Sequence, residues 1–125
     1  MQFLCLGYLE PAKMDDRPKA EIESIMSGCG AHLEELYQTG KVRMDTGLDT
    51  KVVSLRRADG KLRVIDGPFT EAKEMIGSAF LIEAQDLEEA VRIASMHPAV
   101  QIAEGEVFGW GIEIRPIHYF KADAN

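Results

Sequence analysis

Two side chains of this sequence, His32 and Asp66, are of the types that move protons. Imidazole titrates near neutral pH, and a carboxylate can orient it or act as the base. Within hydrogen-bond reach of each other, the two predict general acid/base chemistry on a small organic substrate. Phe69 follows Asp66 in the stretch IDGPF, and an apolar ring beside such a pair lowers the local dielectric and enlarges pKa shifts. On this interpretation IDGPF is a turn that also forms a wall of a cleft.

Both residues also have a purely structural interpretation. Asp-Gly is common turn chemistry, because Asp accepts hydrogen bonds from backbone N–H groups and Gly67 readily takes a positive φ. His32 falls on the border of the apolar stripe of a helix, where half-buried histidines without a chemical role are common. The two interpretations stay open at the level of the sequence.

The candidate ligand-binding residues are Phe69, Lys73, Trp110 and Arg115. Lys73 and Arg115 can meet an anionic ligand, although Lys73 also suits a solvated turn and Arg115 an interface salt bridge. Trp110 closes a glycine-containing segment, Val100 to Trp110, which we expect to be a loop at the rim or lid of the cleft.

Residue spacing predicts no metal site, and we expect no cofactor. The histidines at positions 32, 97 and 118 are far apart, and Cys5 and Cys29 lack zinc-ligand spacing and are expected to be buried hydrophobes. His97 is interpreted as a cation at a helix end and His118 as a surface residue. The sequence contains no phosphate-binding loop and no nucleophile elbow.

Length and charge narrow the class of protein. The 125 residues are expected to form one domain, residues 1–120, with a loose tail at 121–125. Twenty-one acidic residues against 14 basic ones give a net charge of −7, which opposes nucleic-acid binding. No apolar run approaches the ~20 residues of a membrane span. We therefore expect a cytoplasmic protein that binds neither nucleic acid nor membrane.

Periodicity and turn residues predict the elements that position the candidate site. They are a strand at 2–8, one long helix closed by Gly40, a hairpin of 51–57 and 62–66 around Asp59-Gly60, a strand at 76–84 in the same central region, a helix capped by Asp86 with Glu89 and ended by His97-Pro98, and a strand at 112–117. This order predicts an α+β, ferredoxin-like antiparallel sheet with two helices on one face. The strands are apolar at both parities, so we expect a second copy to pack sheet to sheet and form a homodimer.

The stretch DGPFTEAKEMIGSAFLIEAQDLEEAVRIA resembles the signature of the DGPF-domain branch of the YCII-related family. The likeness extends to FLCLGY, HLEELYQTGKV and IEIRPI, and so covers nearly the whole chain. It implies a dimeric α/β-barrel built from two ferredoxin-like protomers. The segment containing Phe108-Gly109-Trp110 departs from the branch.

For function, the resemblance implies an active site with a His–Asp pair in a cleft, and HL at His32 matches the family's histidine. The leading hypothesis is a cleft that binds a small organic molecule and transforms it by lyase- or isomerase-like acid/base chemistry. The alternative is a regulatory module that binds a ligand or protein without catalysis, in a setting associated with sigma factors. The sequence names no substrate.

Overall fold

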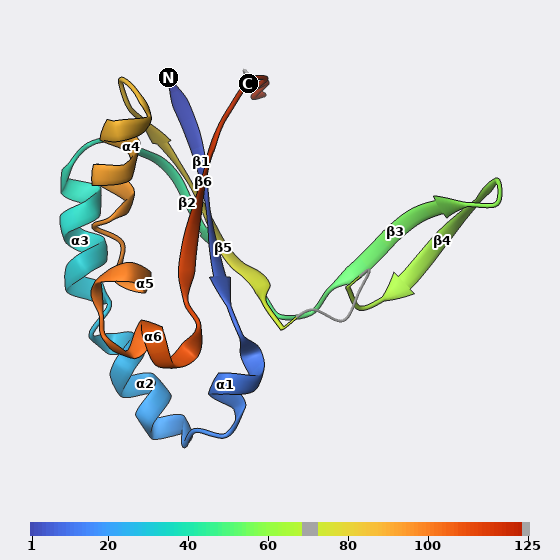
Figure 1. Cartoon of the computed structure of the whole chain (residues 1–125), viewed down its shortest axis with the longest axis horizontal. Coiled ribbons are helices and arrows are strands. Elements are labelled where there is room, and N and C mark those ends of the chain that lie inside the picture. The colour runs from blue at the N-terminus through green and yellow to red at the C-terminus, as the bar shows by residue number, and fades with distance from the viewer. Residues whose placement is uncertain (69–72, 124–125) are drawn as a thin grey trace.

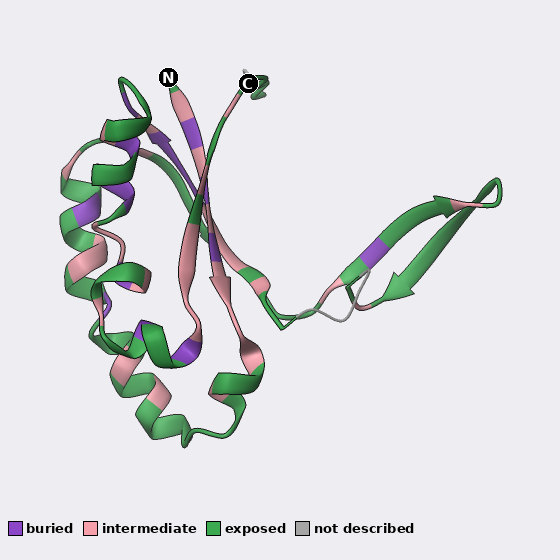
Figure 2. Ribbon diagram, viewed as in Figure 1, coloured by how far each residue is buried: buried purple, intermediate pink, exposed green. Residues whose placement is uncertain are grey.

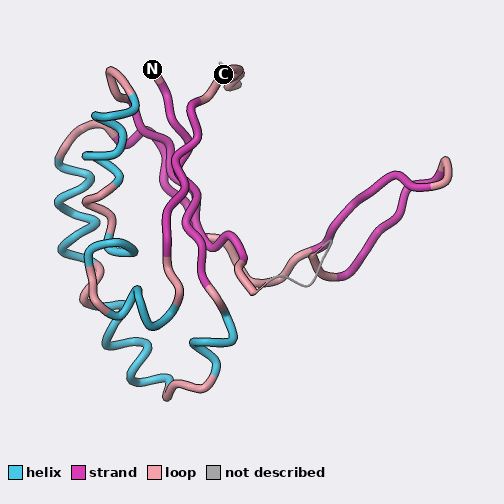
Figure 3. Tube along the Cα trace, in the orientation of Figure 1, coloured by secondary structure: helices cyan, strands magenta, loops and turns pink. Residues whose placement is uncertain are grey.

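The structure, a computed structural model, describes residues 1–68 and 73–123. Figures 1 and 3 show the helices lying to one side of the main strands, and a hairpin that stands away from both. In chain order the elements are β1 (Gln2–Leu9), α1 (Pro11–Asp15), α2 (Lys19–Ser27), α3 (Gly30–Gln38), β2 (Val42–Gly47), β3 (Val53–Ala58), β4 (Lys61–Asp66), β5 (Met75–Glu83), α4 (Leu87–Ala94), α5 (Pro98–Gln101), α6 (Glu104–Phe108) and β6 (Gly111–Pro116).

The main sheet has the strand order β2-β5-β1-β6, and every neighbouring pair is antiparallel. Helices α3, α4, α5 and α6 lie on one side of it (Figure 1). Without the hairpin, the order along the chain is strand, helices, two strands, helices, strand, which is the split βαβ pattern. The expected α+β architecture with an antiparallel sheet is confirmed.

The expected place of the hairpin was wrong. β3 and β4 form a separate two-stranded sheet, and the main sheet takes β2 instead. The sequence of β2, VRMDTG, contains only two large apolar residues because it is an edge strand, so it was missed. The turn itself is confirmed: Asp59 and Gly60 both have positive φ, 53° and 74°, as the primed hairpin turn requires.

The helical segments also differ from expectation in two places. The single long helix is two helices, α2 and α3, separated at Gly28 and Cys29. Gly28 ends α2, which agrees with the low helix propensity of glycine. Gly40 follows α3 with φ 71°, as expected of a left-handed cap. The expected loop Val100 to Trp110 instead contains α6 and the end of α5.

The core lies between the sheet and α3 and α4 (Figure 2). Its largest members from the strands are Phe3, Phe80 and Ile82, and Leu36 comes from α3. Helix α4 adds small residues, including Ala90, that allow the helix to approach the sheet. Free Cys5 is in this core and Cys29 is also buried, as expected.

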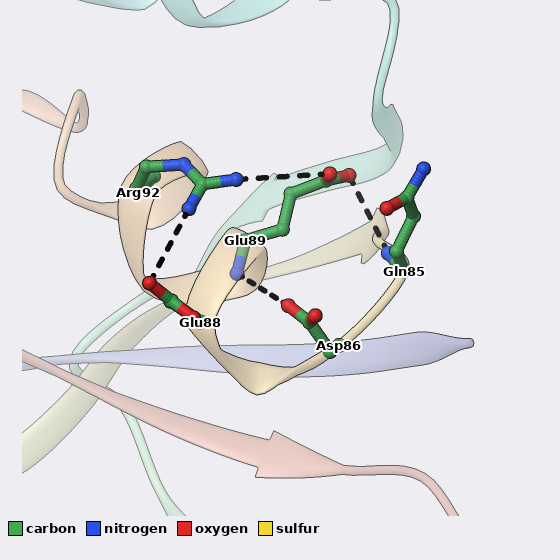
Figure 4. Close-up of polar contacts among 5 residues, drawn as sticks. All are labelled: Gln85, Asp86, Glu88, Glu89 and Arg92. Carbon is green, nitrogen blue, oxygen red and sulfur yellow. Dashed lines mark hydrogen bonds and ion pairs between the residues drawn. The ribbon is translucent and has the colours of Figure 1, made fainter.

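Helix α4 begins with the predicted cap (Figure 4). The Asp86 side chain accepts a hydrogen bond from the backbone N–H of Glu89 at 2.8 Å. The Glu89 side chain reaches back to the backbone N–H of Gln85 at 3.4 Å. Arg92 lies 3.9 Å from both Glu88 and Glu89. The cap pairs N–H groups that the helix start would otherwise leave unpaired.

No helix of the described residues covers the opposite face of the main sheet (Figure 1). The strand register places Leu4 beside Leu81, and Met44 lies on the other side of Leu81. Leu6 lies beside Ala79 on the same face. We call this surface the open face. Among the described residues, no helix is long and apolar enough to cross a membrane.

Candidate active site

A cavity of about 340 Å³ lies at one end of the sheet, on the side of the helices. The strand register explains why space remains there. The inner-face row of Gly7, Ser78 and Gly47 on β1, β5 and β2 has no side chain larger than serine, whereas the neighbouring row includes Phe80. A core needs large side chains to reach its packing density. The small-residue row therefore leaves a hollow beneath the helices.

The walls of this cavity are mainly apolar. They include Met14 of α1, Met26 of α2, Leu33 of α3 and Trp110 before β6. The Trp110 ring packs against the Phe108 ring, with centroids 5.4 Å apart. This tilted contact holds the indole in place at the wall.

His97 is a polar residue of the cavity wall and is held from two sides. Its ring stacks on Phe80, with centroids 5.0 Å apart and planes 7° apart. Its Nδ1 atom accepts a hydrogen bond from the backbone N–H of Ala99 at 3.0 Å, which caps α5. Burial lowers the pKa of His97, and the nearby Asp45 charge opposes this to a lesser degree.

These contacts define the protonation state of His97. A neutral imidazole that accepts at Nδ1 carries its proton on Nε2. Within the described part of the chain, neither a hydrogen bond nor an ion pair involves Nε2. His97 therefore offers an N–H donor to a ligand, and its expected role as a helix-end cation was wrong.

Asp45 supplies a carboxylate on the same inner face, where β2 pairs with β5. One of its oxygens accepts a hydrogen bond from the hydroxyl of Tyr37 on α3. This bond, with burial and the Asp45 charge, raises the pKa of Tyr37 to about 12. Tyr37 therefore stays protonated near neutral pH and fixes the carboxylate. The cavity thus combines a neutral N–H donor with an oriented carboxylate, the components of acid/base catalysis.

The model of the YCII-related domain matches residues 1–115. The chain belongs to the YCII-related domain family. It is 27% identical over 123 residues to an uncharacterized protein of Rhizobium meliloti (strain 1021), with 97% of this chain and 95% of that protein covered. Among solved structures it is similar to 5-chloro-2-hydroxyhydroquinone dehydrochlorinase of Burkholderia phenoliruptrix AC1100, in complex with 2,5-dihydroxybenzoquinone. That match has 18% identity, 96% coverage of both chains and a TM-score of 0.49.

In this YCII-related chain the predicted pair is not brought together. His32 is half-buried on α3 and is not part of the cavity wall. Asp66 is exposed at the end of β4, in the hairpin. Helix α3 and the hairpin lie on opposite sides of the main sheet (Figure 1). Within one chain, the two side chains therefore face separate environments.

The predicted ligand-binding residues also lie in different parts of the molecule. Trp110 lines the cavity. Lys73 is exposed just before β5, and Arg115 lies on the open face in an ion pair with Glu113 at 3.4 Å. Phe69 lies outside the described residues. Of the four, the structure brings Trp110 to the cavity.

Asp45 and Tyr37 were not predicted from the sequence, and the predicted charge state of His97 was wrong. The three come from β2, α3 and the residue before α5, so no short motif joins them. A signal did exist in the small residues Gly7 and Gly47, which the strand register places in one row with Ser78.

The thiols do not provide an alternative nucleophile. Cys29 lines the cavity, but burial, and secondarily Glu104, raises its pKa. Burial raises the pKa of Cys5 to about 11. Thiolate is the reactive form, so both residues are poor nucleophiles near neutral pH. Residues 1–68 and 73–123 contain no cluster of three potential metal ligands.

Proposed function

We propose that this YCII-related protein binds a small, uncharged organic molecule in the cavity beside His97. The cavity volume, about 340 Å³, lies in the usual range of ligand sites, roughly 300–1,000 Å³. Its walls suit a ligand with an apolar body. Among the described residues that line it, Asp45 is the one with a charged side chain. A carboxylate without a neighbouring cation disfavours anionic ligands.

The observation that carries the proposal is the state of His97, a neutral imidazole with its Nε2–H free to bind a ligand oxygen. This donor and the Asp45 carboxylate suit proton abstraction next to a carbonyl group. The proton moves from carbon to Asp45, the electron pair of the C–H bond forms a carbon–carbon double bond, and the π pair of the carbonyl group moves to its oxygen. The Nε2–H of His97 then stabilises the developing negative charge on that oxygen. This is the acid/base chemistry of an isomerase or lyase.

A thermal-shift screen of small metabolites tests the binding proposal, because a ligand of the native state raises the melting temperature. We expect uncharged carbonyl compounds among the hits, and few carboxylates. Trp110 is the only tryptophan of the chain and lines the cavity, so its fluorescence reports binding directly.

A cavity-filling variant provides the control. In Gly47→Leu the new side chain meets no described heavy atom within 4 Å of its Cβ and needs no positive φ. We expect this variant to fold and to lose the hits. Gly30→Ala, which has the same free space at the start of α3, should keep them. Hits that bind Gly47→Leu unchanged would place the ligand elsewhere.

The catalytic part is tested with a bound hit in deuterated water. Exchange of its carbon-bound proton in the wild type, lost in Asp45→Asn, supports acid/base chemistry. Binding without exchange supports the alternative, a regulatory module that senses the ligand. The hypothesis that His32 and Asp66 are the catalytic pair predicts the opposite result: exchange is lost in His32→Asn and Asp66→Asn but kept in Asp45→Asn.

We also propose that two copies pack open face to open face. The support is the apolar centre of that face, where the half-buried Leu4 and Leu6 lie beside the buried Leu81, with no helix of the described residues above them. Antiparallel sheets that face water normally alternate apolar and polar residues. Light scattering at micromolar concentration should give the mass of a dimer, and a monomer would refute this assembly.

A further inference from the structure

The hairpin of residues 51–66, which we call the arm, is a surface that the proposed function does not explain. Its strands pair with each other and stand away from the helices and the main sheet (Figures 1 and 3). Two hydrogen bonds fasten its base: Gly67 N–H donates to the Val52 carbonyl at 2.8 Å, and the Ser54 hydroxyl donates to the Gly67 carbonyl at 2.6 Å. These bonds extend the hydrogen-bonded pairing of β3 and β4 to the base of the arm.

Figure 2 shows the arm as largely exposed. One of its faces carries four apolar side chains, with Arg57 and Asp66 beside them. The register pairs Leu55 with Val64, and Val53 and Leu62 lie on the same face. The exposed fractions of these four side chains are 56% to 67%. An isolated two-stranded hairpin is at best marginally stable in water and needs a further apolar surface to pack against. We therefore expect another apolar surface to pack against this face of the arm.

The charge of the arm indicates the kind of surface that covers it. Residues 51–66 contain five Lys or Arg and two Asp, a net charge of +3, so the rest of the chain carries −10. A basic arm with one apolar face is complementary to an acidic body with an apolar open face. The rest of this same chain has both properties.

The position of the arm agrees with this complementarity. It leaves the main sheet on the side opposite the helices, which is the side of the open face (Figure 1). A second copy packed on the open face would lie beside it. We propose that the arm clasps a second copy of this chain, with its apolar face, which also carries Arg57, against the partner's acidic body. In a two-fold assembly both arms make this contact. The inference rests on the proposed dimer and extends it.

The test compares two double variants by sedimentation at a series of concentrations. Leu55→Thr/Val64→Thr removes apolar contacts while keeping residues of high strand propensity. We expect its dimer dissociation constant to rise ~10-fold or more, since apolar residues at the centre of an interface dominate binding. The matched control, Ala58→Thr/Ile65→Thr, changes the other face of the same hairpin, and its dissociation constant should stay at the wild-type value.

Zero-length cross-linking gives a second readout that does not depend on the fold of a variant. In a dimer mixed from light and isotopically heavy wild-type chains, Lys51 at the base of the arm should link to carboxylates of the other copy. Lys61 lies beside Ala58 on the other face of the arm and should link less. A wild-type dimer with an unchanged dissociation constant in Leu55→Thr/Val64→Thr and no interchain link at Lys51 would overturn the clasp but leave the dimer standing. A monomeric wild type would overturn both.

Discussion

Replacing His97 should separate its two structural roles, the cap of α5 and the ring stack on Phe80. In His97→Ala the cap of α5 is lost, which costs ~1 kcal/mol for a missing N-cap acceptor. The ring stack on Phe80 is lost as well, at ~1 kcal/mol. We therefore expect the free energy of unfolding to fall by about 2 kcal/mol. In His97→Asn the amide oxygen can replace Nδ1 as the acceptor for the Ala99 N–H, so about half of this loss should return.

The pH dependence follows from the lowered pKa of His97. In the unfolded chain the group titrates near its ordinary value of 6.5, and in the folded chain at lower pH. The unfolded state therefore binds more protons just below pH 6.5, so the stability from a neutral His97 is complete above 6.5 and declines as the pH falls. The advantage of the wild type over His97→Asn should shrink between pH 7 and pH 5.

Urea denaturation at 25 °C, with linear extrapolation at several pH values, measures both effects. Imidazole ¹⁵N shifts at pH 7 should show the proton on Nε2. Equal losses in His97→Ala and His97→Asn would mean that Nδ1 does not cap α5. A wild-type advantage that stays constant or grows on acidification would refute the neutral state. Either result would remove the donor on which the proposed mechanism depends.

Three further predictions concern other contacts. Asp45→Asn weakens the hydrogen bond to residue 45 that is the main cause of the raised pKa of Tyr37, and it removes the carboxylate charge as well, so this group should titrate closer to 10 than to 12 in an ultraviolet pH titration. Asp86→Ala removes the α4 cap and should lower the free energy of unfolding by ~1 kcal/mol in urea, whereas Asp86→Ser should lower it less. Gly7→Ala brings a Cβ into the Ser78 hydroxyl and should cost about 1–3 kcal/mol, a loss that Ser78→Gly in the same chain should largely restore.

The features that the sequence predicted well are local. Asp86 and Glu89 form the α4 cap, Asp59-Gly60 forms the primed turn, and Gly40 takes positive φ. Each depends on the backbone chemistry of a few adjacent residues, so no tertiary information is needed.

The errors arose where tertiary partners decide. The strand content of residues 51–66 was correct, but the sequence does not say whether a hairpin joins the sheet or stands apart. His97 was misassigned because its charge state depends on burial against Phe80 and on the Ala99 N–H. Asp45 lines the cavity only because β2 pairs with β5. Such facts are properties of the fold and not of any sequence window.

The small-residue row at the end of the sheet makes the volume of the cavity an adjustable quantity. At Gly7 an added Cβ would meet the Ser78 hydroxyl, so the serine side chain would have to rotate away. Gly47 on the edge strand needs no such adjustment, since no described atom lies within 4 Å of a Cβ placed there. Substitutions from alanine to leucine at this single position would shrink the site in steps without disturbing the Phe80 layer. Related proteins could thus diverge in the size of molecule they accept while keeping one core.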